Sequence, residues 1–223
     1  ASLQGWRLCQ RSRRHDGSIR GAKGMKVSKS SCTTAMRSLI ALAAAAAAKQ
    51  PLLWPLPQNY SCSTQRLTVI PSPGFFRVDA SDVLAAAATR YTKLAFAHGW
   101  GAPGVGLPAL DVKVDAVGAS YPSLDDDESY KLRITATSAT LKARTVWGAL
   151  RGLETFSQLV TYEFDTASYQ VVPCTIQDAP RYPHRGLMVD SGRHFLPVAA
   201  LLHVVDALPY AKLNVLHWHL TDA

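Results

Sequence analysis

Six polar residues follow two short apolar segments near the end of the chain. They are Asp190, Ser191 and Arg193 in the first group and His217, His219 and Asp222 in the second. An arginine donates hydrogen bonds in a fixed fork and an aspartate accepts them from hydroxyls, so Arg193 and Asp222 together suit a neutral polyol such as a sugar. A salt bridge between the two is the other interpretation, and these residue types alone do not decide between them.

The pair His217 and His219 could also do metal chemistry. Residues two apart in a strand point to the same face, which leaves Trp218 on the opposite one. Some hydrolases hold zinc with H-x-H at a strand end, but a stable site needs a third or fourth ligand, and no second histidine cluster follows. We therefore expect no metal site. The two histidines and Asp190 would instead pack behind the ligand-contacting residues and hydrogen-bond to them.

The segments that carry these residues have the order of one strand-helix-strand unit. The run 186–190 is continuously apolar up to Asp190, as in a strand buried on both faces, and 213–219 repeats this pattern. Residues 197–210 form an amphipathic helix between them, in which Pro209 removes a backbone donor and shortens the last turn. Such a unit implies parallel pairing in a (β/α) barrel or an open doubly wound sheet. In a barrel the carboxyl ends of the strands form the active site.

The preceding region has a different pattern. Helical spacing of apolar residues predicts helices over 79–97, capped by Ser81 or Asp82, and over 149–160, while alternation predicts strands over 66–70, 110–115 and 130–135. This mixture indicates a compact α+β unit with a mainly antiparallel sheet. The acidic stretch 125–128 is expected to be a solvated turn, and the prolines of 178–183 mark a domain boundary.

Charge is concentrated at the N-terminus. Residues 1–50 hold ten lysines or arginines and one acid, a net of +9, whereas 51–223 hold fourteen bases and fifteen acids, a net of −1. The globular part therefore lacks the basic excess that nucleic-acid binding needs. The run 38–48 follows Arg37 and is apolar and alanine-rich, which is typical of a signal peptide and too short for a membrane anchor.

Three residues after this leader bear on the secretory pathway. Asn59 begins an Asn-Tyr-Ser sequon for N-glycosylation. Cys62 and Cys174 are the cysteines outside the leader, and they pair either with each other or with a cysteine of a missing segment. We assign 1–48 to a leader and expect a secreted, extracellular or vacuolar/lysosomal protein.

Long stretches of the chain resemble one enzyme family. The sequence APRYPHRGLMVDSGRHFLPVAALLHVVDALPYAKLNVLHWHLTD, with TVWGALRGLETFSQLV and WPLPQNYS upstream, is similar to the β-N-acetylhexosaminidases of glycoside hydrolase family 20, particularly the secreted or vacuolar eukaryotic members. The resemblance implies a zincin-like α+β domain without zinc over 49–178 and the start of a catalytic (β/α)8 TIM barrel over 179–223. No cofactor is implied.

The resemblance also implies roles for individual residues. Arg193 and Asp222 match the family's residues that bind the terminal N-acetylhexosamine, and Arg185 matches a structural arginine. The family's catalytic Asp-Glu pair lies on a later barrel strand, and no such pair follows Asp222. Ala223 stands where an acid is common, and Pro209 replaces a helix-compatible residue. We therefore expect an N-terminal fragment that is itself inactive.

The parent enzyme implied by this resemblance hydrolyses terminal non-reducing N-acetyl-D-hexosamine by substrate-assisted retaining catalysis. Its partners would be N-acetylhexosamine-terminated glycans or chito-oligosaccharides, with no nucleic acid and no stable membrane anchor, and the full-length parent could be a homodimer. Two alternatives stay open: an H-x-H metal-dependent hydrolase, and a non-catalytic carbohydrate-binding or structural truncation product.

Overall fold

A computed structural model describes residues 52–100, 104–116 and 121–221. The description below concerns the unit Pro51–Ala223. The predicted leader, Asp222 and Ala223 lie outside the described residues.

A six-stranded sheet forms the first part of this unit, with strand order β1-β9-β5-β6-β4-β3. The strands are β1 (Asn59–Cys62), β3 (Phe76–Arg77), β4 (Leu110–Ala116), β5 (Tyr130–Ile134), β6 (Ala139–Thr145) and β9 (Cys174–Asp178). Three of the five neighbouring pairs are antiparallel, and the pairs β4–β6 and β3–β4 are parallel. A smaller antiparallel sheet has the order β2-β8-β7, from Leu67–Val69, Ser168–Val171 and Thr161–Glu163.

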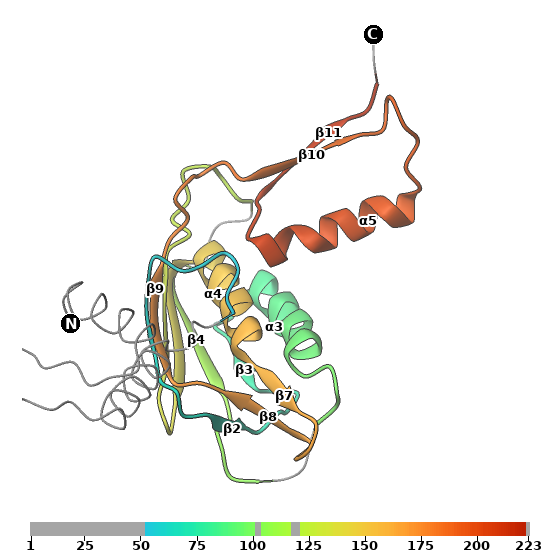
Figure 1. Cartoon of the computed structure of the whole chain (residues 1–223). Helices are drawn as coiled ribbons and strands as arrows, with labels where there is room; N and C mark the ends of the chain where they lie inside the picture. The colour runs from blue at the N-terminus through green and yellow to red at the C-terminus, as the bar shows by residue number, and fades with distance from the viewer. Residues whose placement is uncertain (1–51, 101–103, 117–120, 222–223) are drawn as a thin grey trace, which may run out of the picture. The chain divides into compact units, whose positions relative to one another are not determined.

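Two helices cover one face of the large sheet, as Figure 1 shows: α3 (Asp82–Ala95) and α4 (Val146–Leu159). Ser81, one of the two caps that the sequence predicted, caps α3 by accepting a hydrogen bond from the Leu84 amide. Thr145 caps α4 in the same way at Gly148. A β-carbon at Gly152 would collide with the Leu141 side chain, so this glycine allows α4 to lie close to β6.

The core lies between these helices and the sheet. It contains an aromatic cluster in which Phe75 contacts the rings of Phe76, Phe96 and Phe156 at centroid distances of 5.1 to 5.7 Å. Alternation along the strands places Leu110, Val112, Leu132 and Leu141 in this core with essentially no exposure. The opposite face of the sheet carries only polar side chains from these strands.

A strand-helix-strand unit completes the described chain: β10 (Gly186–Asp190), α5 (Val198–Ala207) and β11 (Val215–His219). The two strands pair in parallel, as the sequence predicted, with Asp190 beside His219. The α-helix ends before Pro209, and a short 3-10 helix η1 (Leu208–Ala211) continues it, which confirms the predicted shortening. No residue of α5 is buried, and Val198 and Leu202 are 70% and 60% exposed.

A disulfide joins Cys62 to Cys174 and links β1 to β9. The two residues are register partners in the sheet, with their Cα atoms 4.1 Å apart. This is the first of the two pairings that the sequence left open.

Candidate functional site

The carboxyl ends of β10 and β11 lie side by side because the two strands are parallel and in register. Asp190 ends β10 and organises the loop that follows. Its carboxylate accepts hydrogen bonds from the amides of Gly192 and Arg193, each at 3.0 Å. The hydrogen bond from the Arg193 amide is the main reason why the pKa of Asp190 lies below its ordinary value, and the nearby charge of His219 lowers it further. Asp190 is therefore a stable anion that fixes the start of the loop.

Arg193 lies in this loop, with a side chain that is 69% exposed. Its Nε atom lies 3.4 Å from a carboxylate oxygen of Asp190. Asp190 thus contacts both the backbone and the side chain of Arg193, and it positions the guanidinium group at the strand end. The sequence left open a salt bridge between Arg193 and Asp222 in place of sugar binding. Asp222 lies outside the residues that the structure describes.

β11 brings His217 and His219 to one face of the two-stranded sheet. His217 lies beside Met188 and His219 beside Asp190 in the register, so these four side chains share a face. Trp218 points to the other face, and its indole Nε1 donates a hydrogen bond of 2.9 Å to Ser191 Oγ. The Ser191 amide donates to the His219 carbonyl at 3.0 Å. These two bonds tie the loop after β10 to the end of β11.

Metal ligation was the rival interpretation of the two histidines. Across residues 52–100, 104–116 and 121–221, no group of three or more His, Cys, Asp or Glu side chains could hold a metal ion. His217 is exposed and His219 is partly buried.

The amino ends of β10 and β11 meet a buried set of charges that we call the root cluster: Glu128, Tyr130, Arg151, Asp178, Arg185 and Lys212. Arg185 directly precedes β10, and its guanidinium group forms an ion pair with Glu128. Glu128 is also paired with Arg151 at 2.8 Å, and the side chains of all three residues are at most 15% exposed. Arg185 donates further hydrogen bonds to the carbonyls of Lys212 and Tyr182.

Lys212 forms the second half of the root cluster. Its ammonium group lies 3.0 Å from Asp178 and 2.9 Å from the Tyr130 hydroxyl, and it is almost fully buried. Burial lowers the pKa of Lys212, and the charge of Asp178 opposes this shift. Burial likewise raises the pKa of the Tyr130 hydroxyl well above its ordinary value. Lys212 has the left-handed φ of +54° at the turn that leads into β11. The cluster therefore fixes the starting points of both parallel strands.

The resemblance implied a structural role for Arg185, but sequence reasoning missed the residues that Arg185 contacts in this cluster. The stretch 125–128 was predicted to be a solvated turn, and this is wrong for Glu128, which is only 8% exposed. Its partner Arg185 lies 57 positions further along the chain, so no local pattern reveals the pair. Position 128 also ends the only adjacent Asp-Glu dipeptide of the sequence, Asp127-Glu128. The Glu128 carboxylate is buried and contacts two arginines, so it is not accessible to a substrate.

Asn59, the predicted N-glycosylation site, is exposed on β1, at the edge of the large sheet. Its side chain is accessible to a modifying enzyme in the folded unit. In the part of the chain that the structure describes, no helix combines the length and the apolar character needed to cross a membrane.

Two family models match the chain. Residues 182–223 match the model described as glycosyl hydrolase family 20, catalytic domain, and residues 102–159 match a model described as beta-acetyl hexosaminidase like. The first match begins just before β10 and includes Arg193 and Asp222. The second covers the central strands of the large sheet and α4.

Proteins with similar sequences are named beta-hexosaminidases. The mouse (Mus musculus) beta-hexosaminidase subunit beta is 38% identical over 205 residues, which are 84% of this chain and 38% of that protein. Beta-hexosaminidase 1 of Arabidopsis thaliana is 36% identical over 196 residues, or 77% of this chain and 36% of that protein. The chain thus spans less than two fifths of the length of these relatives.

Solved structures agree with these matches. A chitobiase of Flavobacterium johnsoniae superimposes with a TM-score of 0.64 at 30% identity, over 76% of this chain and 27% of that one. An exo-β-N-acetylglucosaminidase of Vibrio harveyi, solved with N-acetylglucosamine, gives a TM-score of 0.61 at 29% identity, over 78% of this chain and 26% of that one. The fold and the matched strand ends are similar to those of glycoside hydrolases. The chain belongs to glycosyl hydrolase family 20.

Proposed function

We propose that the whole protein is a β-N-acetylhexosaminidase that removes terminal non-reducing N-acetyl-D-hexosamine from glycans or chito-oligosaccharides. One observation carries the proposal: the match to the family 20 catalytic domain coincides with a parallel strand-helix-strand unit that holds Arg193 at the carboxyl end of its first strand. That end is where barrel enzymes bind their substrates.

The fold assignment is part of this proposal. We assign 1–48 to a leader, 49–178 to a zincin-like α+β domain and 179–223 to the first two strands of a (β/α)8 barrel. The parallel pairing of β10 and β11 across α5 supports a barrel start. The change from a mixed sheet to this unit after Asp178, with Pro180 and Pro183 between them, supports the boundary.

In the bound state, Arg193 would donate to hydroxyls of the terminal sugar and Asp222 would accept from them. Asp190 supports this role because it fixes both the amide and the guanidinium group of Arg193. His217 and His219 would line the base of the site on the same face as Asp190.

Catalysis would be substrate-assisted. The acetamido oxygen of the sugar attacks its own anomeric carbon while a glutamic acid protonates the departing glycosidic oxygen, and water later opens the cyclic intermediate with retention. In the only adjacent Asp-Glu dipeptide of this sequence, Asp127-Glu128, the glutamate is buried in the root cluster, so we infer that the catalytic acid pair is not among the residues of this chain. The chain would contribute substrate binding.

A secretory location is proposed on two observations. Asn59 is exposed for glycosylation, and the disulfide Cys62–Cys174 is typical of oxidising compartments. We propose an extracellular or vacuolar/lysosomal protein, and a homodimer as the assembly of the full-length protein.

The test compares two chromogenic substrates of the whole protein, a β-N-acetylglucosaminide and the matching β-glucoside. Substrate assistance requires the acetamido group, so we expect turnover of the first and a rate on the second that is lower by at least about 1000-fold. Activity must also survive a chelator. Comparable rates on both substrates, or loss of activity with chelator that zinc restores, would favour the H-x-H hydrolase instead, and glycan binding without turnover would favour a non-catalytic protein.

A further inference from the structure

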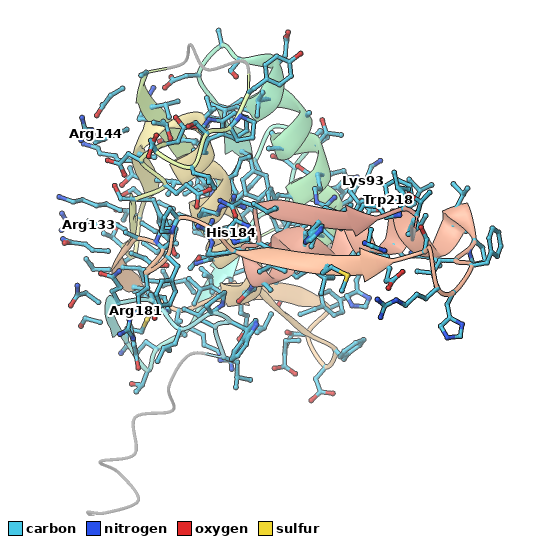
Figure 2. All side chains as sticks on the ribbon, turned by 90° about the horizontal axis from the view of Figure 1, so that it is seen from above. Lys93, Arg133, Arg144, Arg181, His184 and Trp218 are labelled. Carbon is cyan, nitrogen blue, oxygen red and sulfur yellow. A yellow bond between two sulfur atoms is a disulfide. The ribbon has the colours of Figure 1, made fainter. Side chains whose placement is uncertain are left out.

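The outer face of the six-stranded sheet, opposite α3 and α4, is unusually cationic. Outward-facing strand residues include six bases, Arg77, Lys113, Lys131, Arg133, Lys142 and Arg144, and only two acids, Asp111 and Asp115. Residues 51–223 as a whole hold fourteen bases and fifteen acids. Positive charge is therefore segregated onto this face, and Figure 2 shows Arg133 and Arg144 extending from the same side of the fold.

Three lysines form a row across the centre of this face. Lys113 on β4 is the register partner of Lys142 on β6, and Lys142 is the register partner of Lys131 on β5. Strands lie about 4.8 Å apart, so the row spans only about 10 Å at its base. Lys113 has a carboxylate partner, Asp79 at 3.5 Å, whereas Lys131 and Lys142 have none within the described residues.

This arrangement is unfavourable for folding. Like charges that face each other across antiparallel strands destabilise a sheet, and Lys131 and Lys142 form such a pair. Proteins retain such locally unfavourable residue pairs mainly at functional sites. A bound anion would turn the repulsion between these lysines into shared attraction.

The row borders a groove of about 480 Å³. Lys131, Lys142 and Arg144 line it together with the amide side chains of Gln58 and Gln177. Asn59, the proposed glycosylation site, lies at its border on β1. Two acids also line it, but Asp178 is already neutralised by Lys212, which leaves Asp115 as its only other carboxylate. The groove thus offers cations for acidic groups and amides for hydroxyls.

The chemistry of the face discriminates among polyanions. Its outward strand residues include no aromatic or apolar side chain, so nucleic-acid bases would find nothing to stack on. Protein interfaces are enriched in aromatic residues and depleted of lysine at their centres, which is the reverse of this face. Lysine ammonium groups beside amides suit the sulfates or carboxylates and the hydroxyls of an acidic glycan.

We propose that this face, centred on Lys131 and Lys142, is a binding surface for acidic glycans. It is built from β1, β4, β5, β6 and β9, and Arg193 lies outside these strands. The proposal is independent of the hydrolase activity, because the surface would hold an acidic chain whether or not the whole protein cleaves it.

Lysine footprinting of the full chain tests the surface at single residues. The chain is acetylated at limiting reagent with and without a heparin octasaccharide, and the rate at each lysine is read by peptide mass spectrometry. We expect at least about threefold protection of Lys131 and Lys142 and less than about 1.5-fold protection of Lys93, an exposed lysine of α3. This readout is specific to position, so the basic residues 1–50 do not obscure it.

A variant and three further probes complete the test. Lys131→Gln/Lys142→Gln should lower heparin affinity about tenfold without lowering the melting temperature, whereas Lys93→Gln should change the affinity by less than about 1.5-fold. A hyaluronan octasaccharide separates carboxylate from sulfate recognition, and protection by either glycan supports the surface. Equal labelling with and without both glycans would overturn the proposal, and so would equal protection by poly-glutamate or a DNA duplex.

Discussion

Substitution of Glu128 by glutamine tests whether the root cluster fixes the two parallel strands. The substitution leaves Arg151 and Arg185 without a carboxylate in a setting where their side chains are only 12% and 15% exposed. Removal of one partner from a buried ion pair costs about 3 to 5 kcal/mol of unfolding free energy. For a folded unit of this size, that corresponds to a melting temperature lower by about 6 to 20 °C.

The matched control is Asp111→Asn, which makes the same change from acid to amide in an exposed ion pair. Asp111 lies 3.6 Å from Arg77, and the two side chains are 41% and 64% exposed. Such a pair contributes about 0 to 1 kcal/mol. Both variants are melted under circular dichroism. If Glu128→Gln lowered the melting temperature no more than Asp111→Asn does, the cluster would have no role in stability and our account of the strand starts would be wrong.

Three further predictions follow from other contacts. Cys62→Ser opens a loop of 112 residues and should lower the unfolding free energy by about 2 to 5 kcal/mol, and the variant should melt at the same temperature with and without reductant, unlike the parent. The folded-state pKa of Asp190 is lowered, so the contribution of its carboxylate to stability is present above the ordinary value of 3.8 and is lost as the pH falls through the folded-state value. Asp190→Asn should therefore lose less stability on acidification than the parent. If urea melts showed the same loss of stability at acid pH in both proteins, the loop hydrogen bonds would not have the role that we give them. The exposed side chains of Val198 and Leu202 on α5 should cause self-association of the chain, and light scattering should show that Leu202→Glu reduces it; scattering that is equal in both would exclude this helix as the cause.

Sequence patterns located most elements because alternation and helical spacing are local. The strand predicted over 110–115 is β4, and the predicted parallel unit was found with its helix ending before Pro209. The start of α4 was placed three residues late, because β6 runs directly into the helix at Thr145 without a turn. The parallel pairing of β4 with β6 was not predictable from local pattern, since β5 lies between them in sequence.

The candidate site shows the same division. Arg193, His217 and His219 were identifiable because polar residues at the ends of apolar strands are visible in the sequence. The hydrogen bonds by which Asp190 fixes the loop around Arg193 could be found only from the structure, because their donors are backbone amides. The root cluster required the structure even more, because Glu128, Arg185 and Lys212 come together only when distant segments fold.

The central claim is that Arg193 and Asp222 bind the terminal sugar in the whole protein. The most direct test is kcat/KM on a chromogenic β-N-acetylglucosaminide for the whole protein that carries Arg193→Lys or Asp222→Asn, with thermal melting as the folding control. Arg193→Lys keeps the charge but loses the planar fork. Each substitution removes charge-assisted hydrogen bonds, so we predict that kcat/KM falls about 30- to 1000-fold, which corresponds to roughly 2 to 4 kcal/mol. Two normally folded variants with kcat/KM within about threefold of the parent would contradict the assignment.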